Sequence, residues 1–261
     1  MELDDAYANA SHIKGAEGYP PRWQAKAKAF RDGLGGRAEL GLPYGDSPRQ
    51  AFDVFRPQNA AKGTVVFIHG GFWRAFDGSA WSHLAAGPLA RGWAVAMPSY
   101  DLCPQVSIAD ITRQIAVAVR SVAARTEGPI AITGHSAGGH LGARMLDRCL
   151  IPDAVGQRIS AVVPVSPLSD LRPLLKTTMN EDFKLTEQAA IDESPLFMTD
   201  RRKVPVTVWV GADERPAFLD QARWLAEKWH ADHVIAPGKH HFDVIDAMED
   251  AQSDLVCRLT A

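Results

Sequence analysis

The stretch IAITGHSAG, residues 130–138, decides how the rest of the sequence is interpreted. Its first four residues are apolar or β-branched, which is typical of a strand buried on both faces. The motif GHSAG follows at once, and residues 141–150 then have helical character. A serine between such a strand and such a helix lies on a sharp turn that exposes its hydroxyl at the helix N-terminus. The pattern predicts that Ser136 is a nucleophile, with a glycine-rich packing turn as the alternative.

Similar strand-like runs recur along the chain and alternate with stretches of helical character. Residues 51–56 partly alternate apolar and polar side chains, as a half-exposed strand does. Residues 108–122 and 218–229 place apolar side chains on one helical face, and residues 242–259 are predicted to form a closing helix. This alternation predicts an α/β fold with a mostly parallel central sheet and helices on both faces. The almost continuously apolar runs are residues 64–68, 93–97, 130–133, 161–165 and 206–210, with 234–236 as a shorter last candidate.

The length allows one large α/β domain or two small ones, and the absence of an internal repeat, a low-complexity tract or a linker favours one. The 261 residues are 46% hydrophobic, which allows a large buried core. The formal net charge is −3, and the basic residues form no long run, so we expect neither a nucleic-acid nor a membrane partner. No stretch approaches the roughly 20 apolar residues that span a bilayer, and the acidic N-terminus lacks a signal-peptide core. We expect a single domain, residues 1–261, in which residues 1–35 form an N-terminal arm or cap.

The cysteines and histidines point to a reducing compartment and to chemistry without a metal. Cys103, Cys149 and Cys257 are odd in number and far apart, which argues against a disulfide framework and favours a cytoplasmic location. His135 and His140 lie five residues apart, which is no recognised zinc spacing. We therefore expect no metal and no other cofactor.

A second loop, HGGFW at residues 69–73, ends an earlier predicted strand and resembles the oxyanion loop of esterases and lipases. Acyl transfer requires backbone N–H groups that converge on the oxygen that becomes negative. Glycines let the main chain approach that oxygen without a side chain in the way. We expect the donors to be the amides of Gly71, Phe72 and Ala137, and we expect His69 to anchor the loop. The alternative is an ordinary turn after a strand.

A carboxylate and a histidine follow the serine in the order that a catalytic triad on this kind of sheet requires. Glu214 and Asp213 both come directly after a predicted strand. Glu214 is favoured because the acid in related hydrolases commonly falls three residues after a glycine that ends this strand. Asp170 is a more remote choice, because it is better interpreted as a carboxylate that caps a helix or stabilises a loop. His241 is favoured over His240 as the base because it forms a His-Phe pair with the next residue.

Together these motifs resemble the kynurenine formamidase (arylformamidase) branch of the α/β hydrolases, which is related to hormone-sensitive-lipase-type esterases. The resemblance covers roughly residues 50 to 245 and implies an α/β-hydrolase fold. It further implies a serine hydrolase that cleaves a small-acyl ester or an aryl formamide. Two departures are Glu214, where the branch usually has aspartate, and Phe72, where tyrosine is more usual. The matching segments are residues 69–73, 100–104, 134–141, 169–174, 180–185, 193–195, 215–218 and 241–242.

Two other functions remain open at this point. One is a general short-chain carboxylesterase, and the other is a non-catalytic ligand-binding protein on the same fold. Phe72, Trp73 and Trp81 are candidates to narrow the acyl side of the site, with core packing as the alternative. The N-terminal arm, with a short helix predicted over residues 23–30, is a candidate cover for the mouth of the site.

Overall fold

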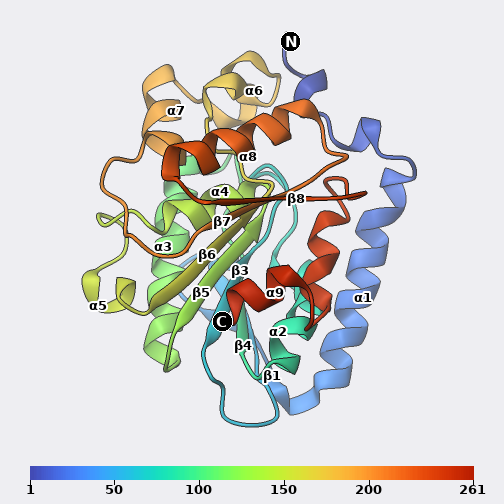
Figure 1. Ribbon diagram of the computed structural model, residues 1–261, viewed down its shortest axis with the longest axis vertical. Helices are drawn as coiled ribbons and strands as arrows, with labels where there is room; N and C mark the ends of the chain where they lie inside the picture. The colour runs from blue at the N-terminus through green and yellow to red at the C-terminus, as the bar shows by residue number, and fades with distance from the viewer.

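The computed structural model describes residues 1–261 and is built around an eight-stranded sheet (Figure 1). Its strands are β1 (Ala38–Pro43), β2 (Ala51–Phe55), β3 (Thr64–Ile68), β4 (Ala94–Pro98), β5 (Ile130–His135), β6 (Ile159–Val165), β7 (Thr207–Gly211) and β8 (Asp232–Ala236). They lie in the order β1-β2-β4-β3-β5-β6-β7-β8. β2 pairs antiparallel with both β1 and β4, and all the other pairs are parallel. The predicted mostly parallel α/β sheet is confirmed.

Helices cover both faces of this sheet (Figure 1). They are α1 (Tyr19–Leu34), α2 (Ala86–Ala90), α3 (Ile108–Arg125), α4 (Ala137–Arg144), α5 (Asp153–Gly156), α6 (Asn180–Phe183), α7 (Glu187–Glu193), α8 (Pro216–Trp229) and α9 (Asp254–Leu259). One face packs against α3, α4 and α8. The other packs against α1, α2 and α9, together with the 3-10 helices Gly78–Ala85 and Val244–Glu249. None of the helices is both long enough and apolar enough to cross a membrane.

The parallel strands bring four separate segments to one edge of the sheet. The carboxyl ends of parallel strands lie on the same side, where ligands of open α/β sheets usually bind. Residues 69–73 follow β3, and Ser136 follows β5. Glu214 follows β7, and His241 follows β8 after a short turn. The topology therefore gathers every predicted catalytic segment at this edge.

The predicted strand segments all lie in strands of the sheet, but β1 was not predicted. Its sequence, AELGLP, contains a glycine and a proline, both of which disfavour strands. Gly41 has φ +66°, and the register of β1 against β2 shifts between Glu39 and Leu42. The strand pairs despite its low propensity because β2 offers it a partner edge.

The prediction of one closing helix over residues 242–259 is wrong. The chain instead forms the 3-10 helix Val244–Glu249, breaks, and then enters α9 at Asp254. Ser253 explains the break, because its hydroxyl donates to the carbonyl of Ala247 at 2.7 Å. The same hydroxyl caps α9 by accepting the N–H of Val256 at 3.2 Å.

The helix after Ser136 also differs from the helical run predicted over residues 141–150. α4 begins at Ala137, directly after the serine, and ends at Arg144. Its end tightens because the N–H groups of Met145 and Leu146 donate to carbonyls three residues back, both at 3.2 Å. The early start places the N-terminus of α4 beside the serine hydroxyl.

Helix α1, at Tyr19–Leu34, is longer than the helix predicted over residues 23–30. Pro20 and Pro21 occupy its first turn, where a missing N–H costs no helical hydrogen bond. Before α1, residues 1–18 form short 3-10 turns. We call residues 1–18 the N-terminal segment.

Candidate active site

The backbone around Ser136 is folded into a tight strand-to-helix turn. Ser136 has φ +58° and ψ −118°, a strained conformation for a residue with a side chain. Its N–H donates to the carbonyl of Val165 at 2.8 Å, which ties the turn to β6. A Cβ atom on Gly138 would lie 2.0 Å from the carbonyl oxygen of Ile68, so only glycine fits there. Tertiary contacts thus hold the serine at the start of α4.

Glu214 and His241 form a buried pair beside this turn. Nδ1 of His241 donates to Oε2 of Glu214 at 2.6 Å. Oε1 of Glu214 accepts the N–H of Gly211 at 2.9 Å and the hydroxyl of Ser166. These three donors hold the carboxylate, and its bond to Nδ1 leaves Nε2 of His241 as the proton acceptor. Ser166, which follows β6, was not among the residues that the sequence singled out.

The competing acids and the competing histidine are placed differently. Asp213 is exposed, and its side chain makes no hydrogen bond within the protein. Asp170 binds the guanidinium of Arg172 at 2.8 Å, as a local loop carboxylate does. His240 accepts the N–H of Phe242 at Nδ1 and contacts the hydroxyl of Tyr19 through Nε2 at 3.0 Å. Of the two neighbouring carboxylates, the structure places Glu214 against His241.

The loop after β3 presents unused backbone donors to the same site. Gly71, Phe72 and Trp73 all have positive φ angles, of 108°, 50° and 54°. The N–H groups of Gly71 and Phe72 make no hydrogen bond within the protein. Ala137 is the first residue of α4, where a helical N–H has no acceptor in the preceding turn. The backbone N–H groups of the three predicted oxyanion donors therefore have no hydrogen-bond acceptor in the loop or in the helix.

His69 stabilises the base of this loop. Its ring stacks on that of Tyr100, with ring centres 4.1 Å apart and planes at 2°. The Tyr100 hydroxyl donates to the carbonyl of His69 at 2.9 Å, and Nδ1 of His69 donates to the carbonyl of Gly70 at 2.8 Å. Burial lowers the pKa of His69 to about 4, so the ring is neutral. These contacts agree with an anchoring role for His69.

Two further buried histidines flank the serine. The ring of His135 lies 4.5 Å from that of His241. Burial, together with His241 nearby, holds the pKa of His135 well below its usual value. His140 donates from Nε2 to the carbonyl of Glu193 at 2.7 Å, and burial lowers its pKa to about 3. Both rings are neutral, so they add no positive charge beside His241.

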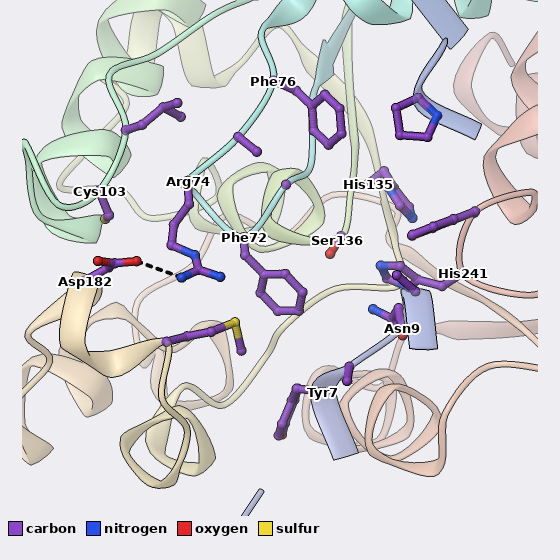
Figure 2. A pocket seen from close by; sticks show the side chains of 18 of the residues that line it. Tyr7, Asn9, Phe72, Arg74, Phe76, Cys103, His135, Ser136, Asp182 and His241 are labelled. Atoms are coloured by element: carbon purple, nitrogen blue, oxygen red, sulfur yellow. Dashed lines mark hydrogen bonds and ion pairs between the residues drawn. The ribbon is translucent and has the colours of Figure 1, made fainter. Parts of the chain in front are cut away.

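A cavity of about 970 Å³ opens in front of these groups (Figure 2). Ser136, His241, Phe72 and Trp81 line it. Trp73 does not: it packs edge-on against His140 and Phe183, with ring centres 5.1 and 5.6 Å away. Of the three aromatic residues expected on the acyl side, Phe72 and Trp81 reach the cavity and Trp73 belongs to the core.

The N-terminal segment forms one wall of this cavity, through Asp4 and residues 7–11. Its buried anchor is Tyr7, whose hydroxyl accepts from the side chain of Gln221 at 3.0 Å. The Tyr7 ring also packs edge-on against Phe218, and Phe218 lies 4.4 Å from the ring of His241. This path connects the segment to the catalytic edge of the sheet.

The charged groups of the cavity lie away from Ser136. The guanidinium of Arg74 and the carboxylate of Asp182 form an ion pair at 2.7 Å, on the side of the cavity opposite His241 (Figure 2). Nowhere in the chain do three His, Cys, Asp or Glu side chains gather in an arrangement that could hold a metal ion. The groups gathered around Ser136 include the imidazole of His241, the carboxylate of Glu214 and the backbone N–H donors of the loop after β3.

Comparison with known proteins identifies the class to which this fold and site belong. The family model of the alpha/beta hydrolase fold matches residues 65–241. The chain belongs to this family, and it is a hydrolase. The predicted α/β-hydrolase fold is confirmed.

Within this class, the chain belongs to the kynurenine formamidase family. It is 30% identical to the kynurenine formamidase of Drosophila melanogaster over 241 residues, which are 82% of this chain and 78% of the relative. It is 26% identical to the enzyme of Salmo salar over 231 residues, 83% and 79% of the two chains. A crystal structure from Silicibacter sp. TM1040, described as a "putative thioesterase", is 61% identical, with a TM-score of 0.99 and 100% of both chains covered.

Proposed function

We propose that this protein is a serine hydrolase that cleaves an aryl formamide or a small-acyl ester through an acyl-enzyme intermediate. Ser136 is the nucleophile, His241 the general base and Glu214 the acid of the triad. The observation that carries the proposal is the buried Glu214–His241 pair, whose histidine lines the same cavity as Ser136. The relatives named kynurenine formamidase support the formamide as substrate.

In the first half of the reaction, Nε2 of His241 takes the proton of the Ser136 hydroxyl as its oxygen attacks the carbonyl carbon. Glu214 keeps the proton of His241 on Nδ1 and stabilises the imidazolium that forms. The negative oxygen is bound by the N–H groups of Gly71, Phe72 and Ala137. Each such donor contributes on the order of 3 kcal/mol to transition-state stabilisation. Because these donors are fixed by the fold, they need no reorientation during the reaction.

In the second half, His241 protonates the leaving amine or alcohol, and the bond to the carbonyl carbon breaks. The acyl group remains on the oxygen of Ser136. A water molecule then gives a proton to His241 and attacks the acyl carbon, and the acid leaves as the proton returns to Ser136. A formamide would yield an amine and formate.

A general acyl hydrolase acting on short oxygen esters or thioesters is the second candidate. The description of the 61% identical Silicibacter protein favours it. Both candidates use the same chemistry, because esters, thioesters and formamides all pass through a tetrahedral intermediate. Phe72 and Trp81 in the cavity support a small acyl group in either case.

Labelling with a fluorophosphonate probe tests the nucleophile. We expect the natural protein to bind the probe covalently and to release a burst of p-nitrophenol from p-nitrophenyl acetate. Ser136→Ala should abolish both, while Ser121→Ala in α3 serves as the matched control and keeps both. Retention of labelling and burst in Ser136→Ala would refute the proposal, as would a natural protein that does not react with the probe.

A panel of substrates separates the two candidates. We expect kcat/KM to be higher for N-formylkynurenine than for phenyl acetate or S-phenyl thioacetate. The reverse order would identify a general acyl hydrolase. Activity should also fall along p-nitrophenyl esters of increasing chain length, and undiminished activity on long chains would contradict a small acyl site.

A further inference from the structure

Asn9 carries a side-chain amide that the mechanism does not use. The residue belongs to the N-terminal segment and is only 6% exposed. It lines the cavity together with Ser136 and His241 (Figure 2). Neither its Oδ1 nor its Nδ2 has a hydrogen-bond partner within the protein. Buried amides are almost always hydrogen-bonded, so an unpartnered one in a cavity indicates that its partner comes from outside the chain.

Hydrogen bonds hold the backbone on both sides of Asn9 and so fix the point on the cavity wall from which its side chain extends. The N–H of Asn9 donates to the carbonyl of Tyr7 at 3.2 Å. Its own carbonyl accepts the N–H of His12 at 3.0 Å. Tyr7 is buried against α8, which anchors this turn to the main body. No hydrogen bond holds the amide itself, and both of its polar atoms are buried, so it turns toward a bound substrate from this fixed backbone position.

Asn9 lies on the side of the site where the leaving group is expected. In Figure 2 its side chain lies on the same side of Ser136 as His241, whereas Phe72 of the oxyanion loop lies on the other side. The path from Tyr7 through Phe218 to His241 agrees with this placement. Because His241 has to protonate the leaving atom, groups on its side of Ser136 face the leaving group.

We propose that Asn9 is a specificity-determining residue that hydrogen-bonds the leaving-group side of the substrate. This inference rests on the proposed function. Oδ1 accepts the N–H at the scissile bond of the substrate. The substrate class that fits is an acylated amine, because a formamide supplies an N–H at the scissile bond and an ester does not. Asn9 therefore favours formamides over esters.

The test compares an aryl formamide with the formate ester of the same aryl group. Asn9→Leu keeps the approximate size but removes both polar atoms, and Asn9→Asp keeps an acceptor but removes the donor. We expect Asn9→Leu to lower kcat/KM for the formamide by about 10- to 100-fold, because the buried N–H of the bound substrate is left without an acceptor. The ester should change by less than about threefold, because it has no N–H for Oδ1 to accept. Asn9→Asp should recover part of the formamide activity.

Folding and the nucleophile are checked in the same variants. Fluorophosphonate labelling of Ser136 in Asn9→Leu should proceed at the natural rate, and Asn59→Leu on the surface should behave as the natural protein on both substrates. Equal losses on formamide and ester, or no loss on either, would overturn the role of Asn9 and leave the triad proposal standing. If the natural protein hydrolyses the ester and leaves the formamide intact, the formamide proposal and the role of Asn9 both fail. Loss of labelling in the natural protein would refute the triad itself.

Discussion

The cavity joins two regions that are built in opposite ways: the carboxyl edge of the sheet and the N-terminal segment. At the edge, Ser136, Glu214 and His241 are buried and follow strands, and buried donors hold the Glu214 carboxylate. The N-terminal segment consists of short 3-10 turns held by one buried tyrosine and by exposed contacts such as Asp5–Arg215, at 2.6 Å. Both regions line one cavity, but the first is held by buried hydrogen bonds, whereas the second is held in part by exposed ion pairs.

This difference indicates which region carries the proposed chemical step and which one determines the choice of substrate. Buried hydrogen bonds at the sheet edge are costly to break, because each leaves a polar group without a partner. Exposed ion pairs contribute only about 0 to 1 kcal/mol each. We infer that substitutions at the edge act on the chemical step, whereas substitutions in the N-terminal segment act on substrate preference. The following predictions are ordered from the largest expected effect to the smallest.

The largest effect is expected at the sheet edge from Glu214→Gln. The glutamine amide can donate to Nδ1 of His241 and so favour the wrong tautomer. We expect kcat for an aryl ester to fall by about 10³- to 10⁴-fold. Asp213→Asn is the matched control and should stay within about twofold, since Asp213 is exposed. A larger loss in Asp213→Asn than in Glu214→Gln would show that the acid has been assigned to the wrong carboxylate.

Acid should destabilise the sheet edge through its buried histidines. Because the pKa of His140 is lowered to about 3, the folded state binds fewer protons than the unfolded state below about pH 6.5. Stability is therefore full above pH 6.5 and falls as the pH drops toward 3. In urea unfolding, the free energy of unfolding of the natural protein should fall between pH 7.5 and pH 5. For His140→Gln this fall should be smaller by about 2 kcal/mol.

The neighbouring variant Trp73→Phe controls for packing around His140. It should lower stability by the same amount at both pH values, because it removes no titrating group. A natural protein whose stability does not change between pH 7.5 and pH 5 would contradict the prediction. So would a His140→Gln variant with the full pH dependence, since His140 would then not be the group that resists protonation.

The smallest effect is expected in the N-terminal segment from Asp5→Asn, which weakens the contact to Arg215. Amide hydrogen exchange in residues 1–18 should accelerate a few-fold, and KM for the formamide should rise by less than about threefold. Raising the salt concentration to about 0.5 M should have a similar effect on the natural protein, because salt screens exposed charges. Asp32→Asn, which removes an exposed ion pair within α1, is the control. A change in kcat or in exchange at β7 would show that the two regions are not independent.

Much of the fold could be predicted from short-range patterns, and the errors fall where those patterns mislead. Nearly continuous apolar runs predicted the strands in the middle of the sheet, which are buried on both faces, and partial alternation predicted β2. β1 was missed, since tertiary pairing overrides the low propensity of Gly41 and Pro43. The closing helix was wrong because Ser253 forms a cap that hydrophobic periodicity does not reveal.

Three residues of the site have properties that arise only when distant segments of the chain pack together: Ser166, Tyr7 and Asn9. Ser166 donates to Glu214, which is 48 residues away in the chain. Tyr7 accepts from Gln221 across 214 residues. Asn9 is notable only because its amide is buried without a partner, and this property exists only in the folded chain. No local motif could have indicated any of the three.

The sequence by itself determined the serine turn, the glycine loop after β3 and the strand-and-helix alternation. Each of these is recognised from residue types and side-chain periodicity within a few residues of one another. Only the tertiary structure decided which carboxylate lies against His241 and that residues 1–18 form a wall of the cavity. Such choices depend on which groups meet after distant segments pack together, and burial then selects the arrangement in which their polar atoms are satisfied. Asn9 departs from this rule, and its unpaired amide is the basis for the proposed substrate hydrogen bond.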